Sequence, residues 1–346
     1  MTDLVTRDFI APAADGYPLS MRLVSAAEPR LAVLVSSGTG FPKGFYERFA
    51  RYLAERGAAV LTYDFRGIAG SRPEELKGST IDYPDWGRLD MPAALDALID
   101  AAPGLRVVHV GHSVGGHFLG FMPNHDRIER HAFVSVGTGW WGGHHRSYNP
   151  MELFFWLGFG PFSLMRHGYI KGGGLWAGTD LPRGVFTTWR RWCMKRAYFS
   201  KELETSLRPH HYEAVTAPIR SWIFTDDPIA TPSTARDLLS VYPKARSDMS
   251  VHAPSDFGAR RIGHEGAGFM MQMLQFQEER MFGAANMIKG LEHCVDATID
   301  YCKQRHTFGQ PLIDNQVIHF RMAELQSEIE ALRALVYHAT ELYVKG

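Results

Sequence analysis

A serine in a glycine-flanked turn directly after a buried strand is the feature that most constrains how this chain can fold. The apolar residues 107–110 read as the strand, and residues 111–116 that follow have the sequence GHSVGG, with Ser113 inside the turn. A serine hydroxyl becomes an accessible nucleophile where the backbone turns sharply from a strand into a helix, and only small neighbours permit that turn. The pattern predicts a nucleophile elbow at Ser113, with an ordinary turn or a helix N-cap serine as the structural alternative.

Alternating strand and helix patterns over residues 1 to about 260 predict an α/β fold with a mostly parallel sheet and helices on both faces. Residues 44–53 have helical spacing, and Gly57 ends that helix. Residues 151–208 are rich in aromatic residues and glycine without a clear period, which indicates a cap or lid inserted after a central strand. The expected strands are residues 31–35, 58–63, 107–110, 132–136, 221–225 and 247–252.

The pattern changes abruptly near residue 266, with no Pro/Gly/Ser linker. We expect an α/β domain over residues 1–264, containing the cap, and an all-α tail over residues 266–346. The expected tail helices are residues 269–274, 278–301 and 315–343.

Composition excludes several classes of function. The formal net charge is zero, from 37 basic and 37 acidic residues, so we expect neither nucleic acid nor an anionic membrane as a partner. Three widely spaced cysteines give no disulfide framework and the N-terminus has no apolar signal segment, so we expect a cytoplasmic protein. The apolar residues 153–162 are too short and too broken by glycine and proline to span a bilayer. We expect no metal site.

A serine nucleophile needs a base and an acid that orients the base. In chains with this kind of elbow, the acid follows the serine and the histidine comes last. Asp226 and Asp227 come directly after the expected strand 221–225, at the edge of a parallel sheet where catalytic groups collect. Asp227 is the predicted acid and Asp226 the alternative, and a plain Asp-Asp-Pro turn is the structural explanation for both.

Two histidines follow the acid along the chain. Residues 247–252 read as the last strand, which places His252 inside that strand and His264 in the loop beyond it. His264 is therefore the predicted base, and His252 is the alternative.

The negative charge of an acyl-transfer intermediate needs backbone N–H donors. One donor is expected from Val114, the residue after the nucleophile, and the second from the loop of residues 36–41, at Thr39 or Gly40. Residues 64–71 read as a structural turn near the site rather than as part of the chemistry.

Residues 31 to about 264 resemble the α/β-hydrolase family, and within it a group of uncharacterised predicted bacterial hydrolases. The resemblance implies a triad of Ser113, Asp227 and His264 that hydrolyses an ester, thioester or amide through an acyl-enzyme on the serine. Many hydrolases carry His-Gly where this chain has Ser-Gly at residues 37–38. The matching segments are residues 37–40, 44–46, 61–68, 111–116, 180–185, 189–193 and 261–264.

Residues 266–346 are similar to part of the carboxyl-terminal helical domain of acyl-CoA dehydrogenases. In that family an arginine, a Phe-Gly turn and a glutamine contact flavin adenine dinucleotide (FAD), which implies that role for Arg305, Phe308 and Gln316. A flavin pocket needs walls from further domains, so we expect no cofactor unless the tail meets those domains. The likeness rests on residues 268–273, 279–280, 301, 305–311, 316 and 322–325.

The sequence thus supports two classes of function. The first is a hydrolase acting on a small apolar acyl substrate, whose activity depends on whether the segment after His264 holds that histidine in place. The second is a catalytically impaired fusion whose helical tail forms a homo-oligomer or docks on another protein, and FAD-dependent dehydrogenation is a distant third. Apolar faces for the second class come from Leu291, Val295, Ile299, Leu325, Ile329, Leu332 and Val336.

Overall fold

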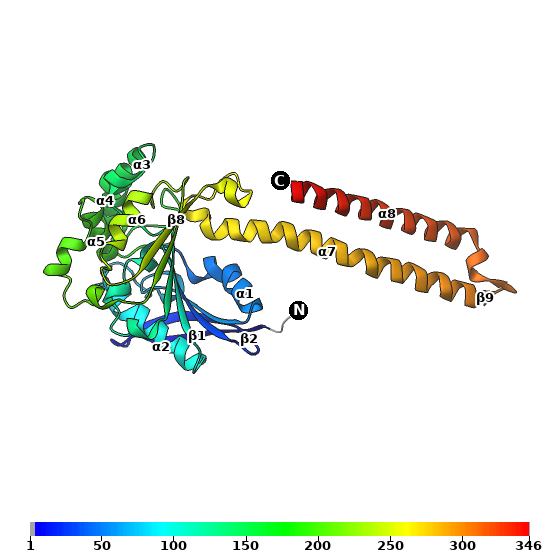
Figure 1. Ribbon diagram of the computed structural model, residues 1–346, viewed down its shortest axis with the longest axis horizontal. Coiled ribbons are helices and arrows are strands. Elements are labelled where there is room, and N and C mark those ends of the chain that lie inside the picture. Colours follow the sequence, from blue (N-terminus) through cyan, green and yellow to red (C-terminus); the bar gives the residue numbers. More distant parts are fainter. Residues whose placement is uncertain (1–3, 346) are drawn as a thin grey trace. The chain divides into compact units, whose positions relative to one another are not determined.

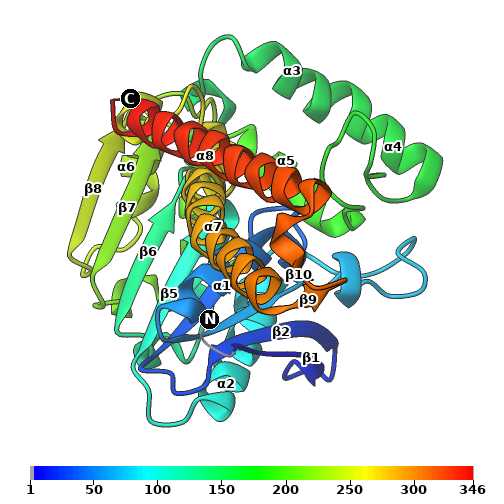
Figure 2. The same cartoon turned by 90° about the vertical axis from the view of Figure 1, so that its right-hand side faces the viewer.

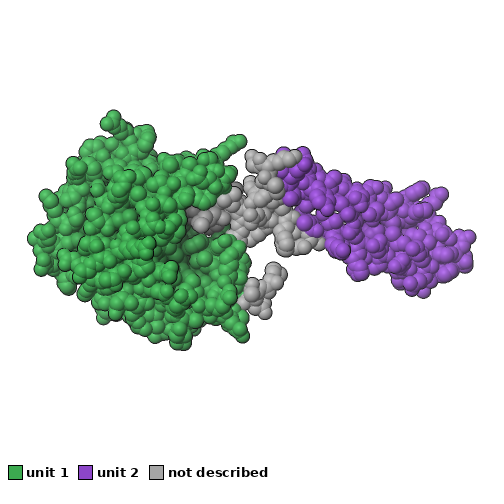
Figure 3. Space-filling model, viewed as in Figure 1, with its two compact units in different colours: residues 1–270 green, residues 271–346 purple. Residues whose placement is uncertain are grey.

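The computed structural model describes the backbone of residues 4–345 and their side chains except those of residues 264–283, 286 and 343–345. The chain divides into two compact units, Met1–Met270 and Met271–Gly346 (Figure 3). The first unit is built on one sheet of eight strands, and the second is a helical hairpin.

The sheet of the first unit has the strand order β1-β2-β4-β3-β5-β6-β7-β8 (Figures 1 and 2). β1 pairs antiparallel with β2 and β2 antiparallel with β4, whereas β4, β3, β5, β6, β7 and β8 are parallel to their neighbours. The carboxyl ends of the parallel strands therefore share one edge of the sheet. The strands are β1 (Leu4–Pro12), β2 (Pro18–Ala26), β3 (Leu31–Ser36), β4 (Ala58–Tyr63), β5 (Val107–His112), β6 (Arg130–Val134), β7 (Ile219–Phe224) and β8 (Ser247–His252).

Three helices connect the strands, and three more form the cap between β6 and β7 (Figure 2). A π-helical turn, Phe155–Phe159, joins the first two cap helices. The connecting helices are α1 (Glu47–Glu55), α2 (Met91–Ala101) and α6 (Pro232–Leu239), and the cap helices are α3 (Asn149–Phe154), α4 (Gly160–His167) and α5 (Arg183–Cys193).

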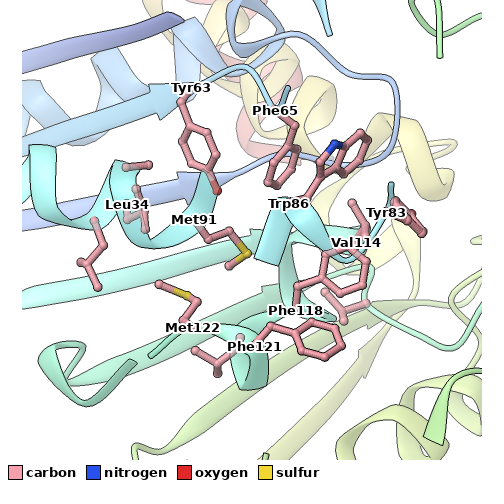
Figure 4. Close-up of a cluster of buried hydrophobic side chains, with 14 of the residues drawn as sticks. Leu34, Tyr63, Phe65, Tyr83, Trp86, Met91, Val114, Phe118, Phe121 and Met122 are labelled. Carbon is pink, nitrogen blue, oxygen red and sulfur yellow. The ribbon is translucent and has the colours of Figure 1, made fainter. Parts of the chain in front are cut away.

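Different helices cover the two faces of the sheet because alternate residues of a buried strand point in opposite directions. Leu34 and Leu61 pack in the same cluster as the residues of α2, whereas Val33 and Val60 pack with those of α1. The α2 cluster extends to the serine turn, since it includes the buried side chain of Val114 (Figure 4). The residue after Ser113 is thus fixed by the main hydrophobic core.

A row of hydrogen-bonded polar side chains crosses this core. The Tyr63 hydroxyl lies 2.7 Å from Ser36 Oγ, which lies 3.0 Å from His109 Nε2. His109 Nδ1 lies 3.3 Å from His131 Nδ1. Burial lowers the pKa of His109 to about 3 and that of His131 well below its usual range. Both imidazoles are therefore neutral in the folded protein at neutral pH.

The expected α/β architecture is confirmed, and all six predicted strands are present with ends shifted by at most two residues. β1 and β2 were not predicted. β1 is an edge strand with mostly exposed side chains, so its sequence lacks a clear apolar alternation. The predicted helix 44–53 begins as a 3-10 turn, Lys43–Tyr46, and continues as α1.

The second unit contains most of α7 (Gly263–Gln304) and all of α8 (Gln316–Lys345), joined by the short strands β9 (His306–Thr307) and β10 (Gln310–Pro311). The prediction of separate helices over 269–274 and 278–301 is wrong, because α7 is one helix of 42 residues with no proline to end it. The predicted domain boundary at 264–266 stays a prediction, since α7 runs across it. No helix within the described residues is long and apolar enough to cross a membrane.

The buried histidines predict how the stability of the first unit depends on pH. In the unfolded chain both histidines bind protons near pH 6.5, whereas in the folded protein His109 stays neutral down to about pH 3. The stabilisation is therefore complete above about pH 6.5 and falls as the pH drops, by up to about 1.4 kcal/mol per pH unit for each histidine. Urea unfolding followed by tryptophan fluorescence between about pH 7 and about pH 5 measures the total slope, to which the buried Asp90 contributes with the opposite sign because burial raises its pKa to about 7.

The matched variant for this measurement is His131→Leu, which removes one of the two groups and should reduce the slope by up to about 1.4 kcal/mol per pH unit. A slope that is the same in the variant and the wild type would contradict the assignment.

Candidate active site

Ser113 lies at the end of β5 in a strained backbone conformation. Its φ is +50°, in the left-handed region that residues other than glycine rarely adopt. The predicted sharp turn is confirmed, but the helix expected after it is wrong, because two short 3-10 turns follow, Ser113–Gly116 and Leu119–Phe121. The glycines at 115, 116 and 120 disfavour a continuous α-helix there.

The glycines of the elbow are required by close packing. A Cβ atom at Gly115 would lie 2.2 Å from the carbonyl oxygen of Ser36, at the end of the neighbouring strand β3. A Cβ at Gly111 would lie 2.7 Å from the backbone nitrogen of Gly116, and one at Gly116 would lie 2.7 Å from the side chain of Val136. The turn after β5 therefore contacts β3 directly through backbone atoms.

The predicted oxyanion donors share one cavity with the serine. Ser113, Val114, Thr39 and Gly40 all line a cavity of about 770 Å³. Within the described part of the chain, neither the Thr39 N–H nor the Gly40 N–H donates to another residue. Both groups are thus available to a ligand. The cap closes this side of the cavity, because a Cβ on Gly40 would lie 2.6 Å from the Trp176 ring.

The Tyr46 hydroxyl connects the loop of residues 36–41, which we call the oxyanion loop after its predicted role, to the elbow at Ser113. It accepts a hydrogen bond of 2.9 Å from the Gly38 N–H and lies 2.7 Å from Nδ1 of His112, the residue before Ser113. Burial raises the pKa of Tyr46, so the phenol is neutral and can donate to the imidazole while it accepts from the amide. Sequence reasoning missed this residue, because no local pattern relates positions 46 and 112.

Two further contacts hold the oxyanion loop. The Thr39 hydroxyl is hydrogen-bonded to the Tyr83 hydroxyl. The Gly40 carbonyl accepts from both the N–H and the hydroxyl of Thr179, at 3.0 and 3.1 Å. Because Thr179 belongs to the cap, the position of the oxyanion loop depends on the cap as well as on the sheet.

The predicted acid, Asp227, is buried in the turn after β7. Its Oδ1 accepts from the N–H groups of Ile229 and Ala230, at 2.8 and 2.9 Å, which fixes the orientation of the carboxylate. The alternative, Asp226, makes different contacts: its Oδ2 accepts from the N–H groups of Ile262 and Gly263, at 2.7 and 2.9 Å. Asp226 therefore holds the segment that leads into His264.

The two candidate histidines lie in different surroundings. His252 ends β8 as predicted, and its half-buried ring lies 3.7 Å from the Asp256 carboxylate and 5.4 Å from the Phe257 ring. It does not line the Ser113 cavity. The helix α7 begins at Gly263, and His264 is its second residue. The prediction that His264 lies in a loop is therefore wrong. The His264 side chain lies outside the described residues.

The rest of the cavity is largely apolar. The Glu152 carboxylate there accepts from the Trp156 indole N–H at 3.0 Å and lies 2.7 Å from His144 Nδ1. The Cys193 thiol also lines the cavity, but burial raises its pKa well above the usual range, so it is not a thiolate nucleophile. Among the described residues, no group of three or more His, Cys, Asp and Glu could hold a metal ion. The aromatic lining residues are Phe41, Phe45, Tyr83, Tyr148, Phe155, Trp156, Trp176 and Trp189.

The residues that correspond to flavin contacts lie around the hairpin turn of the second unit. Arg305, Phe308 and Gln316 are all exposed, and the Phe308 ring is fully accessible. Three exposed side chains on one hairpin do not enclose a cofactor. The described residues therefore do not fit an FAD site, and we derive no flavin chemistry from them.

Comparison with known proteins finds similarity to two different families in two parts of the chain. Residues 27–157 match the family model described as serine aminopeptidase, S33, and residues 266–346 match that of the acyl-CoA dehydrogenase C-terminal domain. An acyl-CoA dehydrogenase of Bacillus subtilis (strain 168) is 39% identical over 88 residues, which are 25% of this chain and 23% of that protein. Cyclohexane-1-carbonyl-CoA dehydrogenase of Geobacter metallireducens is 35% identical over 85 residues, 25% of this chain and 22% of that protein. The chain thus spans less than a quarter of these relatives.

Solved structures resemble most of the chain. A soluble variant of monoglyceride lipase from Saccharomyces cerevisiae has a TM-score of 0.52 and 17% identity, covering 80% of this chain and 94% of that one. A thermostable carboxyl esterase from Bacillus coagulans has a TM-score of 0.52 and 13% identity, covering 79% and 97%. At these identities the likeness shows the fold alone, which is that of α/β hydrolases.

Proposed function

We propose that the first unit is a serine hydrolase that cleaves an ester, thioester or amide through an acyl-enzyme on Ser113. One observation carries the proposal: Ser113, in a strained elbow, lines a cavity together with the unoccupied N–H groups of Thr39 and Gly40. A nucleophile and oxyanion donors around one space are what acyl transfer requires. The α/β-hydrolase fold and the matching family model support the same class of reaction.

In the proposed mechanism, His264 takes the proton from Ser113 Oγ, which attacks the acyl carbonyl carbon. The N–H of Val114 and one from Thr39 or Gly40 stabilise the oxyanion, and His264 returns the proton to the leaving group. Water then attacks the acyl-enzyme by the same route and releases the acid. Asp227 orients the imidazole, and the turn that fixes its carboxylate supports this role.

The lining of the cavity favours an apolar acyl group. Its eight aromatic residues carry no charge, and the one carboxylate among the lining residues, Glu152, is already hydrogen-bonded to Trp156 and lies 2.7 Å from His144 Nδ1. An aromatic cavity without a free charge binds hydrocarbon well and an ionised group poorly. A small apolar acyl chain is therefore the proposed substrate.

A fluorophosphonate probe tests the nucleophile. We expect covalent labelling of the wild-type protein and none of Ser113→Ala, because the probe reacts only with an activated serine. Cys193→Ala is the matched control, since it removes the buried thiol that lines the same cavity, and its labelling should persist. Absence of wild-type labelling, or labelling of Ser113→Ala, would contradict the proposal.

Tyr46→Phe tests the connection between the oxyanion loop and the elbow. Loss of the hydroxyl removes its contacts with the Gly38 N–H and with His112 Nδ1, so kcat for p-nitrophenyl butyrate should fall about tenfold. KM should change less than about twofold, because the hydroxyl does not line the substrate cavity. The matched control is Tyr17→Phe, which removes a hydroxyl that hydrogen-bonds to Ser71 in the structural turn and should leave kcat unchanged. Equal kcat in Tyr46→Phe and the wild type would show that the hydroxyl has no positioning role.

Self-association is a second candidate function, and the surface of the helical hairpin favours it. Among the side chains of the hairpin that the structure describes, few apolar ones are buried, and these include Val295, Cys302 and Ile329. Two helices packed against each other leave their outward apolar side chains exposed. The hairpin of a second copy would cover these side chains by forming a four-helix arrangement. The exposed apolar side chains of the hairpin are Met287, Leu291, Tyr301, Phe308, Val317, Phe320, Leu335, Tyr337 and Leu342.

Light scattering of the full chain tests the second candidate. We expect a dimer or larger oligomer for the wild type, and a monomer for the double variant Val317→Glu/Leu335→Glu, because a buried charge opposes association. Ser327→Glu, a charge added at a polar exposed position of α8, should leave the oligomer intact. A monomeric wild type at micromolar concentration would exclude this function.

A further inference from the structure

A second cavity lies in the cap, across α5 from the cavity that contains Ser113. It has a volume of about 640 Å³ and is lined by α4, α5 and residues 77–78. Along α5, Arg183, Phe186 and Arg190 line this cavity, whereas Trp189 lines the Ser113 cavity. The spacing of 3 and 4 residues between the first three places them on one face of the helix. α5 thus separates two cavities of different character.

Positive charge dominates the second cavity, which we call the cap pocket. Lys77, Arg166, Arg183 and Arg190 line it, and no acidic residue does. Among the described residues, none of these four side chains has a carboxylate oxygen within 4.0 Å. In contrast, the neighbouring Arg191 on α5 points elsewhere and pairs with Glu202 at 3.0 Å.

One of the four cations is held in position by the protein. Arg190 Nε donates a hydrogen bond of 2.7 Å to the carbonyl of Trp156, which leaves its two terminal nitrogens as donors for a ligand. A guanidinium fixed in this way loses little conformational freedom when it binds an anion. The apolar side chains of Leu164, Met165 and Phe186 complete the lining and can contact an organic group attached to that anion.

Four like charges around one space repel one another, and in a chain of zero net charge they are not part of a general basic surface. An anion in the pocket would reverse the repulsion. Arginine forks match the oxygens of phosphate in paired hydrogen bonds. A single carboxylate would neutralise only one of the four cations, and a pocket of about 640 Å³ is far larger than one phosphate ion.

We propose that the cap pocket binds an organic ligand through a pyrophosphate-type group that carries two phosphates. The group would lie among Lys77, Arg166, Arg183 and Arg190, with the organic part against Phe186 and its apolar neighbours. Such a ligand is either a separate phosphorylated molecule or the far end of a substrate whose acyl group lies at Ser113. Binding itself does not depend on the proposed hydrolase activity.

Calorimetric titration of the full chain with inorganic pyrophosphate tests the binding. We expect wild-type binding that weakens with added salt, and an affinity lower by about tenfold or more in Arg166→Gln/Arg183→Gln, because charge-assisted hydrogen bonds are lost. Both side chains are exposed and unpaired among the described residues, so the variant should keep the wild-type melting temperature. Arg191→Gln is the matched control on the same helix and should bind like the wild type.

Two results would overturn the proposal: no binding of pyrophosphate by the wild type at millimolar concentration, or equal affinity in the double variant and Arg191→Gln. The source of the phosphates is then decided by kinetics with butyryl-coenzyme A and with the butyryl thioester of N-acetylcysteamine, which lacks phosphate. A KM raised in the double variant for the first thioester only assigns the pocket to the substrate. Unchanged KM values together with lost pyrophosphate binding assign it to a separate ligand.

Discussion

The backbone contact between Gly115 and the Ser36 carbonyl determines where the other parts of the site can lie. β3 and β5 are neighbours, with Ser36 opposite Gly111, so the turn after β5 folds onto the end of β3. The residues that follow Ser36 form the oxyanion loop, with Thr39 among them. The distance between Ser113 and the loop of residues 36–41 is therefore set by two strands in contact and depends little on flexible side chains. Because no side chain fits between them, this geometry requires glycine.

Side chains from outside the sheet also hold the loop of residues 36–41 in place. Tyr46, at the start of α1, connects the oxyanion loop to the elbow, and Thr179 connects the same loop to the cap. A buried hydrogen bond in a region of low dielectric holds its groups more firmly than one in water. The cap thus has two structural effects. Its aromatic residues form the apolar part of the Ser113 cavity, and Thr179 helps to hold the loop that carries Thr39 and Gly40.

The sequence was informative where structure depends on neighbouring residues. The elbow at Ser113 and the carboxylate-bearing turn at Asp227 were predicted because glycine packing and Asx turns leave local patterns. Tyr46 was not predicted, because its hydrogen bond to His112 spans 66 positions and depends on the arrangement of the sheet. The start of α7 at Gly263 was also missed, since a strand followed by a loop was the simpler interpretation of residues 247–264.

The two adjacent aspartates after β7 accept hydrogen bonds from different segments of the chain. Asp226 accepts hydrogen bonds from Ile262 and Gly263, so the α/β unit itself fixes the backbone at which α7 begins. A helix of any origin attached after Gly263 would start from the same place, without a change in the elbow or the oxyanion loop. A segment exchanged by recombination after residue 263 would therefore begin from a backbone position that Asp226 fixes, but it would have to supply the proposed base at position 264.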